Sequence, residues 1–104
     1  MKNNDELPAF IENYQRACRQ FDLLKNSASQ DNASARMAYN ECRIALQDSK
    51  QSLDHFLQLL HSEDTTKKDY YLHEAQQALL HFKELIREAE IKVKNARPMP
   101  PFLY

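Results

Sequence analysis

Glycine and tryptophan are both absent from this sequence of 104 residues. The four prolines stand at positions 8, 98, 100 and 101, so residues 9–97 contain neither proline nor glycine. Because these two residues are the usual breakers of helices, a stretch of 89 residues without them predicts a mainly helical chain. The missing glycines also exclude the loops that cradle phosphates and dinucleotides, since such loops need a close approach of the backbone. We therefore expect no nucleotide chemistry.

Long apolar runs are absent as well. No run approaches the roughly 20 apolar residues that a membrane-spanning helix needs, and the N-terminal residues lack the apolar core of a signal peptide. We therefore expect no membrane span and a cytoplasmic protein, unless the protein is exported by a route that needs no signal peptide.

The sequence also lacks a large excess of charge of either sign. The net charge is -1, and it is -1 over residues 1–33, -2 over residues 34–66 and +2 over residues 67–104. Nucleic-acid binding favours a concentrated basic face, which this small imbalance does not provide. We expect no nucleic-acid partner.

Apolar residues recur at alternating steps of three and four in three segments, which is the spacing of a buried seam on an α-helix. We predict helices over residues 6–26, 34–61 and 66–96, joined by polar turns and followed by an extended proline-rich tail over residues 97–104. Asp31, Asn32 or Ser34 is expected to cap the middle helix. The seam of that helix consists of Tyr39, Cys42, Leu46, Ser49, Leu53, Phe56 and Leu60.

Short connections place neighbouring helices antiparallel, and a seam of 3.5-residue spacing favours a shallow crossing angle of about 20°. The predicted fold is a single-domain, all-α, antiparallel three-helix bundle with up-down-up topology, coiled-coil-like packing and a left-handed twist. Its register pairs Tyr14 with Leu46, and Leu46 with Phe82. The first helix has about 20 residues and the others nearly 30, so at ~1.5 Å per residue the second hairpin should extend past the first helix by roughly 10 to 15 Å.

The cysteines and histidines carry no metal-binding pattern. Cys18 and Cys42 both fall on seam positions, which predicts small buried core residues, and the sequence contains no C-x-x-C spacing. The histidines at positions 55, 61, 73 and 81 fall on outer helix positions, whereas a metal site in a bundle needs ligands that project inward. Those at 55 and 73 share one level, so a surface metal site stays open as an alternative.

The end of the second hairpin and the tail are the apolar segments that the bundle does not obviously cover. Exposed apolar patches of this kind mark protein interfaces. The predicted partner-binding residues are Phe56, Leu59, Leu60, Tyr70, Tyr71, Phe102, Leu103 and Tyr104. Two alternatives remain: residues 1–6 or a bend in the long helices cover the hairpin end, and the tail packs back on the bundle instead of docking in a partner.

No catalytic motif, cofactor motif or small-molecule site is evident, and a helical bundle with a filled seam offers no obvious pocket. We therefore predict a small non-catalytic protein-binding module, such as an adaptor, a chaperone-like protein or an accessory protein, which binds a protein partner or self-associates. One alternative is a small metal- or ligand-binding bundle that uses the surface histidines. Another is an accessory subunit of an enzyme that requires a partner chain.

Overall fold

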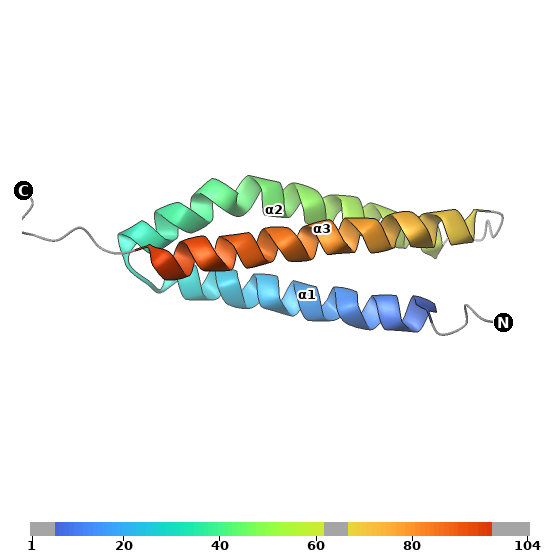
Figure 1. Cartoon of the computed structure of the whole chain (residues 1–104), viewed down its shortest axis with the longest axis horizontal. Coiled ribbons are helices and arrows are strands. Elements are labelled where there is room, and N and C mark those ends of the chain that lie inside the picture. Colours follow the sequence, from blue (N-terminus) through green and yellow to red (C-terminus); the bar gives the residue numbers. More distant parts are fainter. Residues whose placement is uncertain (1–5, 62–66, 97–104) are drawn as a thin grey trace, which may run out of the picture.

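The chain forms three α-helices that lie side by side along most of their length (Figure 1). The computed structural model describes residues 6–61 and 67–96. Helix α1 spans Glu6–Ser29, α2 spans Ala33–Leu60 and α3 spans Lys68–Asn95, and the described residues contain no strand. The chain runs up, down and up, so α1 and α3 are parallel to each other and antiparallel to α2. The predicted all-α three-helix bundle is confirmed.

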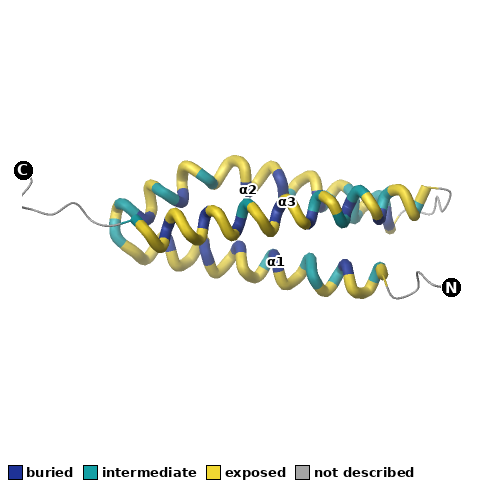
Figure 2. Tube along the Cα trace, in the orientation of Figure 1, coloured by how far each residue is buried: buried dark blue, intermediate teal, exposed yellow. Residues whose placement is uncertain are grey.

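One apolar core follows the long axis of the bundle, where the three seams face each other (Figure 2). The largest side chains that are fully buried belong to Leu46, Leu53, Phe82 and Ile86, all on α2 and α3. Helix α1 reaches this core through Phe21, whose ring meets that of Phe82 edge to face, with a centroid distance of 5.7 Å and an interplanar angle of 85°. Aromatic rings favour this arrangement because the positive edge of one faces the negative face of the other.

Helix α1 ends three residues later than the sequence predicts. Residues 26–29 include asparagine and serine, which favour turns because their side chains bond the nearby backbone. However, Ala28 is only 1% exposed, and burying it against the other helices keeps this last turn helical. Asn32, one of the three predicted caps, then starts α2: its side-chain oxygen accepts a hydrogen bond of 2.9 Å from the backbone N–H of Ala35.

The second hairpin is longer than the first helix, as predicted, but by less. With 24 residues in α1 and 28 in each of the others, α1 is about 36 Å long and its neighbours about 42 Å at ~1.5 Å per residue. The first turn of α3 extends past the N-terminus of α1, whereas the end of α2 lies about level with it (Figure 1). The overhang therefore consists of roughly one turn of α3 and is shorter than predicted.

Candidate functional site

The hairpin tip is the name we give to Phe56, Leu59, Tyr70 and Tyr71, which lie near the end of α2 and at the start of α3. Tyr70 is 59% exposed, whereas the other three side chains are half-buried. The two tyrosine rings adjoin each other, with centroids 5.7 Å apart and planes inclined at 57°. Leu60 was also expected here, but it is only 2% exposed and belongs to the core.

The remaining residues predicted to bind a partner are Phe102, Leu103 and Tyr104 of the tail. They lie outside the residues that the structure describes.

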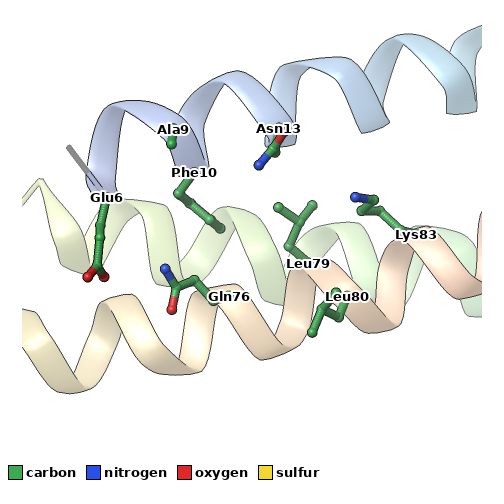
Figure 3. Close-up of a pocket in the computed structure, with 8 residues that line it drawn as sticks. All are labelled: Glu6, Ala9, Phe10, Asn13, Gln76, Leu79, Leu80 and Lys83. Carbon is green, nitrogen blue, oxygen red and sulfur yellow. The ribbon is translucent and has the colours of Figure 1, made fainter.

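A groove that sequence reasoning missed runs between α1 and α3. It consists of three hollows of about 310, 330 and 420 Å³. The first and second share Leu80 and Lys83, and the second and third share Glu90, so the hollows are continuous along the seam. Figure 3 shows the first hollow, into which Phe10 extends from α1 and Leu79 from α3. We call this feature the α1–α3 groove.

The α1–α3 groove is apolar at its floor and of mixed charge at its rim. Phe10 and Leu79 at the floor are buried, while Leu80 and Leu23 at the rim are 55% and 68% exposed. The charged residues that line it are Glu6, Asp31, Lys83, Glu84, Arg87, Glu90 and Lys94. Because both signs alternate along the rim, the groove does not select an anion or a cation. Sequence could have indicated it only through the exposed leucines, which interrupt the polar face of each helix.

A polar cluster joins α1 to α2 on the other side of α1. The hydroxyl of Tyr14 donates a hydrogen bond to Oδ1 of Asp54, and Nζ of Lys50 donates to Oδ2 of the same carboxylate at 3.1 Å. Sequence reasoning placed Tyr14 opposite Leu46. Its hydroxyl instead reaches Asp54, eight residues further along α2. A long side chain on a helix points towards the N-terminus of that helix, which accounts for part of this offset; the rest means that α1 and α2 are shifted along their axes from the predicted register.

Burial and hydrogen bonding keep the protons of this cluster in place. Burial raises the pKa of the Tyr14 phenol, and the hydrogen bond to Asp54 raises it further. Burial also raises the pKa of the neighbouring Cys18 thiol. A thiol with a raised pKa holds little thiolate and is a poor nucleophile. The cluster is therefore suited to holding two helices together rather than to nucleophilic chemistry.

The cysteines and histidines occupy less buried positions than a core or metal site requires. Cys18 and Cys42 are free thiols that pack against the core but are only half-buried, so the prediction that they are buried core residues is correct only in part. Both lie at the edge of the α1 and α2 seams, where solvent reaches part of each side chain. The four histidines are all exposed, as predicted. Among the described residues, no group of three or more His, Cys, Asp or Glu side chains is placed to hold a metal ion.

Over the described parts of the chain, none of the helices combines the length and the apolar character that crossing a membrane requires.

Comparisons with known proteins add no functional information. No protein-family model matches the chain, and searches of curated proteins and of solved structures return no match.

Proposed function

We propose that this chain is a non-catalytic protein-binding module and that the hairpin tip is its principal binding surface. The observation that supports this proposal is the exposure of Tyr70: the residue is 59% exposed in the first turn of α3, which extends past the neighbouring helix α1. Tyrosine is favoured at binding hot spots because it buries a large area while losing little conformational freedom. A partner gains this area without unfolding the bundle.

The tip also offers more than one isolated tyrosine. Tyr70 lies against the ring of Tyr71, and the ring of Phe56 lies 6.0 Å from that of His55. Ring contacts of this kind restrict the rotation of the side chains before a partner arrives, which lowers the entropy cost of binding. A partner with an apolar pocket for the Tyr70 ring and polar groups around it fits this surface.

The test compares the wild-type chain with Tyr70→Ser and with a control, Gln77→Ser. Position 77 is exposed and lies two turns further along the same outer face of α3. Each purified chain is used to isolate binding proteins from cells of its source, and each protein recovered is then purified and titrated against all three chains. Circular dichroism of the variants verifies that their helix content is unchanged.

We expect at least one protein to bind the wild type and the Gln77→Ser control equally and to bind Tyr70→Ser roughly 30-fold more weakly. This ratio corresponds to about 2 kcal/mol, the loss typical of truncating a tyrosine at a hot spot. Sedimentation of the three chains covers the case in which the partner is a second copy. If every binding protein, and any self-association, tolerates Tyr70→Ser, the hairpin tip is not the binding surface.

A further inference from the structure

Helix α1 is attached to the bundle more weakly than α2 and α3 are attached to each other. The backbones of α2 and α3 approach closely along their length, and α1 approaches either of them less often. On its α3 side, α1 borders the three hollows of the α1–α3 groove, while α2 and α3 share a hollow of about 360 Å³. Side chains next to a hollow lack packing partners on that side and lose the dispersion attraction those partners would provide.

On its α2 side, α1 is held by the cluster of Tyr14, Lys50 and Asp54. The side chains of Lys50 and Asp54 are 35% and 41% exposed, so water competes with the hydrogen bond from Tyr14. This cluster therefore fixes the position of α1 without adding the large stabilisation that a fully buried network provides.

The α2–α3 hairpin has contacts that do not depend on α1. Leu85 of α3 packs against the core and, with Ser49 and Ala78, lines a hollow between α2 and α3 that no residue of α1 borders. The start of α2 is also held without α1. Asn32 caps the helix by accepting a hydrogen bond from the backbone N–H of Ala35, and the guanidinium of Arg36 donates to the carbonyl oxygen of Asp31 at 2.7 Å. These hydrogen bonds lie within residues 31–36 and remain when α1 moves.

We infer that α1 is a detachable helix: it opens as one unit about Ser29 and Gln30, while α2 and α3 stay paired. Opening exposes the side of the core that α1 covers, including the ring of Phe82 on which Phe21 rests. The closed state thus keeps an apolar face of the α2–α3 hairpin covered, and the open state presents it. Elements that move during ligand binding and allostery are drawn from segments that open locally at low cost.

Native-state hydrogen exchange on the full chain tests this inference. Near neutral pH we expect the amides of α1 to be protected at least about 10-fold less than the central amides of α2 and α3, because α1 opens more often than the chain unfolds. A substitution that affects only the contact between α2 and α3 then separates the opening of α1 from global unfolding. Leu85→Ala weakens the α2–α3 hairpin in both the closed and the α1-open states, so it changes the free energy of global unfolding but not that of α1 opening.

Leu85→Ala should therefore lower the protection of the central α2 and α3 amides by about 5-fold or more and leave that of α1 within about 2-fold. Tyr14→Phe is the matched control, since it weakens only the closed state and should lower the protection of both sets of amides by the same factor. Leu85→Val replaces Leu85→Ala if the latter does not fold. Equal protection of all three helices in the wild type, or an equal loss of protection in α1 and α3 for the Leu85 variant, overturns the inference.

Discussion

Two tyrosine hydroxyls in this bundle differ in their hydrogen bonding, which makes them a matched pair for a stability measurement. Tyr39 is 6% exposed, and its hydroxyl is buried without a hydrogen-bond partner among the described residues. Tyr14 donates its hydroxyl proton to Asp54. Tyr39→Phe and Tyr14→Phe each remove one oxygen atom and leave the ring in place.

The expected changes in the free energy of unfolding have opposite signs. A buried polar group without a partner costs about 1–3 kcal/mol, so we expect Tyr39→Phe to leave stability unchanged or to raise it by up to ~1 kcal/mol. A hydrogen bond to a charged group contributes about 1.5–3 kcal/mol. Because Asp54 is 41% exposed and keeps its ion pair with Lys50, we expect Tyr14→Phe to lose only about 0.5–1.5 kcal/mol.

Urea unfolding followed by circular dichroism measures both changes. For an m-value near 2 kcal/mol/M, a change of 1 kcal/mol moves the midpoint by about 0.5 M, which is readily resolved. The two variants should keep the wild-type m-value, since neither changes the surface exposed on unfolding. A loss of more than about 1 kcal/mol for Tyr39→Phe would refute the reasoning, because it would mean that the hydroxyl of Tyr39 has a stabilising partner.

Three further predictions follow from the core, the first turn and the titrating groups. Phe82→Ala should lower the free energy of unfolding by about 3–5 kcal/mol, because the ring is 0% exposed; a loss below ~1 kcal/mol in urea would mean that the ring is not central. Asn32→Ala should lower it by ~1 kcal/mol through loss of the N-cap, while Asn32→Ser should recover most of that stability. The pKa values of Tyr14 and Tyr39 are raised above 10.0 in the folded state, mainly by burial. The unfolded chain therefore loses these protons first, so stability should hold below about pH 10 and fall above it, less steeply in the two phenylalanine variants; urea midpoints that do not change across this range would contradict the assignment.

The three helices and their buried faces could be predicted from the sequence. The alternation of apolar residues at steps of three and four is a local property of each segment, and it placed Leu46 and Phe82 in the core, where both are 0% exposed. The end of α1 was predicted less well, because residues 26–29 favour a turn by their own chemistry. Their helical form depends on burying Ala28, which is a tertiary contact.

Sequence by itself determined which segments are helical, that they form one bundle and that aromatic residues gather near the end of the second hairpin. The tertiary structure alone decided that Leu60 is buried while Tyr70 is exposed, that Tyr14 reaches Asp54 and that a groove follows α1 along α3. The physical reason is that periodicity is a local property of each helix, whereas the packing of helices against each other is not. Periodicity identifies the face that a helix buries, whereas the axial offset and spacing between helices depend on all their side-chain contacts at once.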